Sequence, residues 1–182
     1  DPNPQSPNFG GYSERDIFDW FNPVSIAEQN KNDGRESRLL ASIRGEYNFT
    51  SNFKAAVFYA SQRETFWNGR YSPKTAKFGG GFGRKGLATV ENNERLNDLF
   101  EATLNYDKEV GKLDMAFLGG YSYQEFFNQG DYTQAGNFLT DAFTYNNLGA
   151  ALDFANGLAT VYSYATENKL VAFFGRANFN ID

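Results

Sequence analysis

The 182-residue chain contains no cysteine and no histidine, and these two absences exclude much of the chemistry that a domain of this size could perform. Without cysteine there is neither a disulfide framework nor a thiolate metal site. Without histidine the commonest general base and metal ligand is missing, so nucleophilic triads are unsupported as well. The formal net charge of −5 argues against nucleic acid as a partner. We therefore predict a protein that is not an enzyme and holds no cofactor and no metal.

A long hydrophobic run is also absent. No stretch of 18 consecutive apolar residues occurs, which excludes a transmembrane helix. Aromatic residues, by contrast, are abundant, with 19 phenylalanines and 11 tyrosines. The mean hydropathy of −0.58 does not exclude a membrane β-barrel, because lipid-facing and polar residues that alternate along a strand cancel in an average.

Residues 39–49 alternate between apolar and polar side chains, which indicates a strand with one apolar and one polar face. Four further segments repeat the pattern. The five predicted strands span residues 37–49, 53–65, 95–107, 112–125 and 168–181. Each supplies the roughly 9–11 residues that a tilted membrane strand needs. We expect the apolar face, made of even positions in the third strand and odd positions in the others, to contact lipid.

The connections between these strands are alternately short and long. Short polar links at 50–52 and 108–111 suit tight hairpins, whereas 66–94 and 126–167 read as long irregular loops. Because outer-membrane barrels have short periplasmic turns and longer extracellular loops, we predict an all-β, antiparallel transmembrane β-barrel segment whose long loops are extracellular. Within one barrel domain we assign residues 1–34 to a further extracellular loop, 35–125 to two hairpins and 168–182 to a final strand.

A wall of five strands has two open edges whose backbone groups would face lipid without partners. We therefore expect the chain to be a fragment of a larger barrel or one chain of a split one.

Several segments of the chain resemble the SusC-like family of TonB-dependent outer-membrane transporters, in the family's usual order from about residue 22 to the end. They are Asn22-Pro23-Val24, Arg38 to Tyr47, Leu104 to Lys108, Leu118 to Glu125, Tyr145 to Gly149 and Phe174 to Phe179. The resemblance implies a barrel of about 22 strands with an internal plug, embedded in outer-membrane lipid. It also implies import of glycans or peptides with a SusD-like surface lipoprotein. The family's plug, TonB box and closing strand have no counterpart here, so contact with TonB is expected through a part of the protein outside this chain.

Six aromatic residues in the predicted long loops are candidate ligand contacts, because aromatic rings stack on sugar faces and on peptide side chains. They are Trp67, Tyr71, Phe82, Tyr132, Phe138 and Tyr145. The alternative is that these rings pack within the loops or against a partner protein.

The segment from Gly81 to Gly86 matches the dinucleotide-binding pattern G-x-G-x-x-G. The residues before it, 71–77, are loop-like and do not form the buried strand that this fingerprint requires. We interpret it as part of an extracellular loop.

Two other functions remain open from the sequence. A soluble β-sandwich that binds carbohydrate also shows alternating strands, although it would rarely combine long loops on one side with only tight turns on the other. A passive, porin-like structural barrel would differ in having neither a plug nor a lipoprotein lid.

Overall fold

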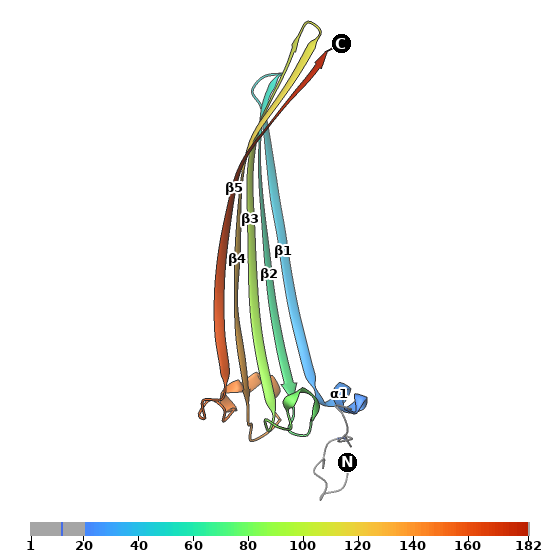
Figure 1. Cartoon of the computed structure of the whole chain (residues 1–182), viewed down its shortest axis with the longest axis vertical. Helices are drawn as coiled ribbons and strands as arrows, with labels where there is room; N and C mark the ends of the chain where they lie inside the picture. Colours follow the sequence, from blue (N-terminus) through green and yellow to red (C-terminus); the bar gives the residue numbers. More distant parts are fainter. Residues whose placement is uncertain (1–11, 13–20, 182) are drawn as a thin grey trace, which may run out of the picture. The chain divides into compact units, whose positions relative to one another are not determined.

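The computed structural model describes Tyr12 and residues 21–181, and within them five long strands dominate. The strands are β1 (Lys31–Asn48), β2 (Phe53–Ser72), β3 (Leu87–Val110), β4 (Leu113–Gly136) and β5 (Thr160–Ile181), and the helical segments are α1 (Pro23–Gln29) and the 3₁₀ segments η1 (Phe78–Gly80) and η2 (Thr144–Ala150). The strands form one antiparallel sheet in the order β1-β2-β3-β4-β5 (Figure 1). The predicted all-β, five-stranded antiparallel arrangement is confirmed.

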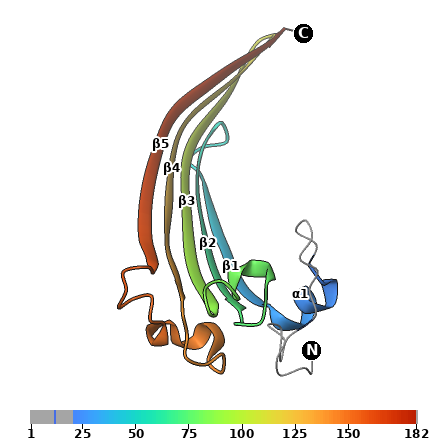
Figure 2. The same ribbon diagram turned by 60° about the horizontal axis from the view of Figure 1, so that its bottom comes forward.

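The internal contacts divide the chain into two units. We call residues 37–65, 94–129 and 165–181 the turn unit, because it contains both tight turns. The remaining described residues, 21–36, 66–93 and 130–164, form the loop unit. Figures 1 and 2 show η1 and the segment around η2 at the same end of the strands within the loop unit.

The two tight turns of the turn unit are held by local hydrogen bonds. In the first, the backbone N–H of Phe49 donates to the carbonyl of Phe53 at 2.9 Å, and the Asn52 side chain donates to the carbonyl of Asp107 on β3 at 2.8 Å. The second turn consists of only the two residues between Val110 and Leu113, so the predicted link at 108–111 is misplaced. Gly111 has a φ of +66°, a conformation that glycine adopts without strain, and it therefore fixes where β3 reverses.

Side-chain contacts across the turn unit join positions that were predicted to share a face. On the apolar face the ring centroids of Phe100 and Tyr121 lie 6.4 Å apart, and those of Tyr121 and Phe173 lie 5.2 Å apart. On the polar face Gln124 donates to Asn97 at 3.2 Å. The apolar side chains are largely exposed, with 80% of Phe173 accessible. They therefore cover an open surface, as lipid contact requires.

The strands extend well beyond their predicted bounds on the side of the long connections. β2 continues to Ser72, β3 begins at Leu87, β4 continues to Gly136, β5 begins at Thr160 and β1 begins at Lys31. The predicted loops 66–94 and 126–167 are therefore wrong in extent, and the true connections are 73–86 and 137–159. The predicted loop 1–34 likewise contains α1 and the start of β1, while residues 1–11 and 13–20 lie outside the described residues. The extensions escaped prediction because apolar and polar residues do not alternate regularly along them, and the run Glu91 to Glu94 is polar on both faces.

Helix α1 precedes β1 and begins with the residues that favour a helix start. The side chain of Asn22 accepts a hydrogen bond from the backbone N–H of Val24 at 3.0 Å, and Pro23 occupies the first helical position. Among the described residues, no helix is long and apolar enough to cross a membrane.

The apolar face can be tested with one pair of neighbouring substitutions on β3. Leu104 lies on the apolar face with half of its surface exposed, and Thr103 points to the opposite face. In the full-length protein, Leu104→Arg should lower the free energy of unfolding by up to about 2–4 kcal/mol, because an arginine that faces lipid is desolvated. Thr103→Arg should cost much less. Reversible unfolding from lipid vesicles measures both, and equal losses would contradict the assigned faces.

Candidate functional site

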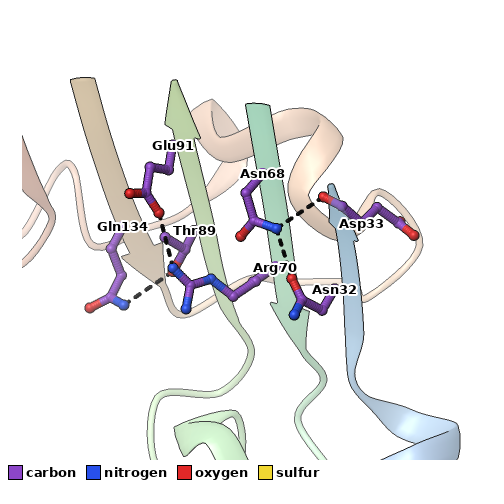
Figure 3. A network of polar contacts seen from close by, with 7 residues as sticks. All are labelled: Asn32, Asp33, Asn68, Arg70, Thr89, Glu91 and Gln134. Carbon is purple, nitrogen blue, oxygen red and sulfur yellow. Dashed lines mark hydrogen bonds and ion pairs between the residues drawn. The ribbon is translucent and has the colours of Figure 1, made fainter. Parts of the chain in front are cut away.

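A ladder of polar side chains crosses one face of the loop unit, from β1 to β4 (Figure 3). Asn68 donates from its amide to the Oδ1 atom of Asn32 at 2.8 Å and to the carbonyl of Asp33 at 3.2 Å. Arg70 donates a hydrogen bond to Glu91 at 3.1 Å, and Gln134 donates one to Thr89 at 3.1 Å. We call Asn32, Asn68, Arg70, Thr89, Glu91 and Gln134 the polar ladder. Because each cross-strand pair contributes roughly 0.2–1 kcal/mol, the ladder helps to hold the strand extensions together on this face.

Three tyrosines lie on the same face as the polar ladder. Tyr132 is two residues from Gln134 on β4, so both side chains point the same way. Its ring stacks on that of Tyr162 from β5, with centroids 5.0 Å apart and an interplanar angle of 18°. Tyr164 accepts a hydrogen bond from Asn93 at 2.5 Å, and its ring lies where a side chain at Gly130 would be. This face therefore combines amides, hydroxyls, one ion pair and aromatic rings.

The opposite face of the loop unit is covered by the 137–159 connection. Tyr71 is only 3% exposed and packs with Ala88, Ala135, Phe138 and Ala151 in a small buried cluster. The rings of Tyr71 and Phe138 are 5.7 Å apart, and the Tyr71 hydroxyl donates to Asp141 at 2.5 Å. Burial and this hydrogen bond raise the pKa of the Tyr71 phenol above its usual range. Of the two interpretations of the loop aromatics, packing within the loops describes Tyr71 and Phe138.

Trp67 and Tyr145 form a second aromatic pair, away from the polar ladder. Their rings meet edge to face at 5.5 Å, and the guanidinium of Arg35 lies 5.4 Å from the centroid of the Trp67 ring. The Tyr145 hydroxyl donates to the carboxylate of Asp33, and this hydrogen bond raises the pKa of Tyr145. Gly69 makes room for the pair, because a Cβ there would lie 2.7 Å from Trp67 and 2.8 Å from Tyr145.

The structure therefore does not gather the six predicted aromatic residues into one site. Phe82 lies in the 73–86 connection with its ring exposed, and the Lys77 ammonium is 5.9 Å from the ring centroid. Trp67, Tyr71 and Tyr132 lie on strands and not in loops, which corrects their predicted setting. Of the six, Tyr132 is the one that shares a face with the polar ladder.

Tyr162, Tyr164 and the members of the polar ladder were not predicted as site residues, because their segments were assigned to loops. The pattern Tyr162-Ser163-Tyr164 places two aromatic residues two positions apart, which is the spacing of one strand face. That local signal could have placed the two tyrosines on a common surface. The amide pairs leave no such pattern, because their partners lie on different strands.

A buried carboxylate ties the two long connections of the loop unit together. Asp153, in the 137–159 connection, is 2% exposed. It accepts a hydrogen bond from the backbone N–H of Gly136 at 2.6 Å and forms an ion pair with Arg84 of the 73–86 connection. The loop connections are therefore held in place at the end of β4.

Comparison with known proteins agrees with this architecture. The chain is 31% identical over 160 residues to the TonB-dependent receptor P3 of Formosa agariphila, which covers 87% of this chain and 15% of that receptor. In fold it is similar to a chain of the RagAB peptide importer, with a TM-score of 0.78 in the closed-closed state and 0.77 in the open-open state. Both matches have 14% sequence identity and cover 90% of this chain and 18% of the other. No family model matches the chain.

The sheet with its exposed apolar face, together with these similarities, defines a segment of an outer-membrane β-barrel wall. The chain is similar in sequence to a TonB-dependent receptor along most of its length, in agreement with the SusC-like resemblance of its ordered segments. It spans about 15% of the length of the curated relative that it matches.

The contacts of Asp153 with Gly136 and Arg84, which we call the clamp, can be tested by a substitution at Gly136. A Cβ at Gly136 would lie 2.8 Å from the carbonyl oxygen of Gly86 and 3.0 Å from both the Arg84 carbonyl and the Asp153 carboxylate. Because two of these atoms belong to the backbone, Gly136→Ala should destabilise the clamp by about 1–3 kcal/mol and expose the 137–159 connection to protease. Gly83→Ala is the matched control, because a Cβ there meets nothing within 4 Å. Equal cleavage rates for both variants and the parent protein would contradict the clamp.

Proposed function

We propose that the chain forms part of the wall and outer vestibule of a TonB-dependent importer that takes up glycans or peptides across the outer membrane. The observation that carries this proposal is the 31% identity to a TonB-dependent receptor along most of the chain. The single sheet formed by the described residues, with its apolar face exposed, supports a membrane wall over a soluble β-sandwich, in which a second sheet would cover that face. Transport, and not catalysis, is the proposed activity.

The loop unit is proposed to lie outside the cell, and the two tight turns to lie in the periplasm. The difference in length between the two sets of connections supports this orientation. The polar ladder with Tyr132, Tyr162 and Tyr164 would then line the vestibule, while Phe82, Trp67 and Tyr145 would lie near its outer rim. TonB would act on a part of the protein outside this chain.

A SusD-like surface lipoprotein is the proposed partner at the 137–159 connection. This connection carries several exposed apolar side chains, among them Leu139 at 81% exposure and Phe143 at 52%. Exposed apolar side chains that cluster on one segment are typical of protein interaction surfaces. The neighbouring fold in the RagAB peptide importer, a two-component assembly by its name, supports the same interpretation.

The orientation can be tested with single cysteines in the full-length protein, made free of other accessible cysteines. Gly83→Cys lies in the 73–86 connection with open space around its side chain, and Ser51→Cys lies in the first tight turn. A membrane-impermeant thiol reagent added to intact cells should label Gly83→Cys and leave Ser51→Cys unlabelled until the outer membrane is opened. The reverse pattern would invert the proposed topology.

The transport function and the partner surface can be tested together. The double variant Leu139→Ser with Phe143→Ser should capture less lipoprotein and slow ligand uptake several-fold, while the barrel still assembles. Val110→Ser, an exposed apolar residue at the opposite end of its strand, is the matched control and should change neither. Uptake that persists without TonB would favour a passive porin over an energised importer.

A further inference from the structure

We propose that a hollow on the face of the polar ladder, next to Asn30, is a subsite for one sugar unit of a neutral oligosaccharide. The hollow has a volume of about 310 Å³, at the lower end of the range for small-ligand sites. Its lining includes Arg70, Thr89, Tyr132 and Gln134 from the strands, and Asn30 and Gly79 from the segments beside the strand ends. The assignment rests on the proposed import function and narrows its ligand class to glycans.

The side chain of Asn30 supplies the first reason for a ligand. Its amide nitrogen donates to the carbonyl of Ile26 at 3.3 Å, which fixes the orientation of the side chain. Its Oδ1 atom is buried and accepts no hydrogen bond within the part of the chain that the structure describes. A buried acceptor without a donor is costly, so a hydroxyl group that enters the hollow gains a hydrogen bond that the protein alone does not make.

Glycine at position 79 keeps the hollow open next to this oxygen. Gly79 has a φ of +84°, and a Cβ there would lie 2.4 Å from the hydroxyl oxygen of Ser72 and 3.2 Å from the Asn30 oxygen. A larger residue would therefore be strained in its backbone and would crowd the Asn30 acceptor. The local conformation of η1 and the space beside the buried Asn30 acceptor thus depend on the same glycine.

The other polar groups of the hollow match a ligand that both donates and accepts. Gln134 uses its amide nitrogen to donate to Thr89, which leaves its carbonyl oxygen as an acceptor for the hollow. One nitrogen of Arg70 donates to Glu91, and the guanidinium carries further N–H donors. Glu91 balances the charge of Arg70, so this pair does not require an ionised ligand. Sugar hydroxyls, each a donor and an acceptor, fit this set.

The position of the hollow favours a sugar over a peptide. An extended peptide is usually bound by main-chain hydrogen bonds to a free sheet edge, whereas the hollow lies on the face of the inner strands β2, β3 and β4 and next to β1. The backbone groups there are already paired with neighbouring strands. The ring of Tyr132, stacked on Tyr162, provides the flat apolar surface that the carbon-bound hydrogens of a pyranose ring contact.

The test uses the full-length transporter, purified with its lipoprotein, and a panel of short neutral hexose oligosaccharides beside a mixture of short peptides. Binding is measured by calorimetry for the parent protein, Asn30→Ala and Tyr132→Leu. Each variant should bind the oligosaccharide recognised by the parent protein about 3- to 10-fold more weakly. This is the loss expected for one neutral hydrogen bond or one ring contact. Asn146→Ala is the control, because this exposed asparagine bonds only locally to Thr144 and lies outside the hollow.

Unchanged oligosaccharide affinity in both variants, with barrel assembly intact, would overturn the subsite and leave the import proposal standing. Binding of peptides alone, weakened by the same substitutions, would overturn the assignment to sugars. Absence of TonB-dependent uptake of any ligand by the parent protein would instead overturn the proposed function. If the Asn30→Ala variant fails to assemble, the Tyr132→Leu variant tests the subsite by itself, because Tyr132 lines the hollow from strand β4.

Discussion

The requirement that every backbone N–H and C=O group in an apolar medium be paired governs this structure. It explains why five long strands follow one another as hairpins in simple order, since each strand then satisfies its neighbour along its full length. It also explains why β1 and β5, which each have one unpaired edge here, need further strands beside them. The apolar side chains on one face do not form a core of their own, because the surrounding lipid takes the place of a second layer.

The same requirement decides how much could be predicted from the sequence. In the turn unit apolar residues recur at every second position, so the five strands were predicted, and side-chain contacts join positions that were predicted to share a face. Beyond that region, segments such as Glu91 to Glu94 are polar on both faces and carry no alternation, so their strands were assigned to loops. The contacts that stabilise them, such as Asn68 with Asn32, join residues far apart in sequence. Neither the polar ladder nor the hollow beside Asn30 could be inferred from local pattern.

In the loop unit, the two faces of the same strands have different roles. On one face, Tyr71, Phe138 and the carboxylate of Asp153 fasten the long connections to the sheet. The other face carries the polar ladder and the tyrosines. The side chains proposed to contact a ligand are thereby carried by hydrogen-bonded strands, whose positions are better defined than those of free loops. Of the aromatic residues predicted as ligand contacts, Tyr71 and Phe138 belong to the first face and Tyr132 to the second.

In β2, β3 and β4, successive side chains point to opposite faces without interruption from the turns to the strand ends. This restricts how the length of a strand can change in evolution. Every cross-strand contact in both units keeps the same odd and even assignment. Adding one residue inside β2 would exchange the two faces for the rest of that strand, directing Tyr71 to the face of the polar ladder and Arg70 to that of the buried cluster. Adding two residues would preserve both. Strand-length variation among homologues should therefore occur in steps of two, whereas the connections at 73–86 and 137–159 are free of this restriction.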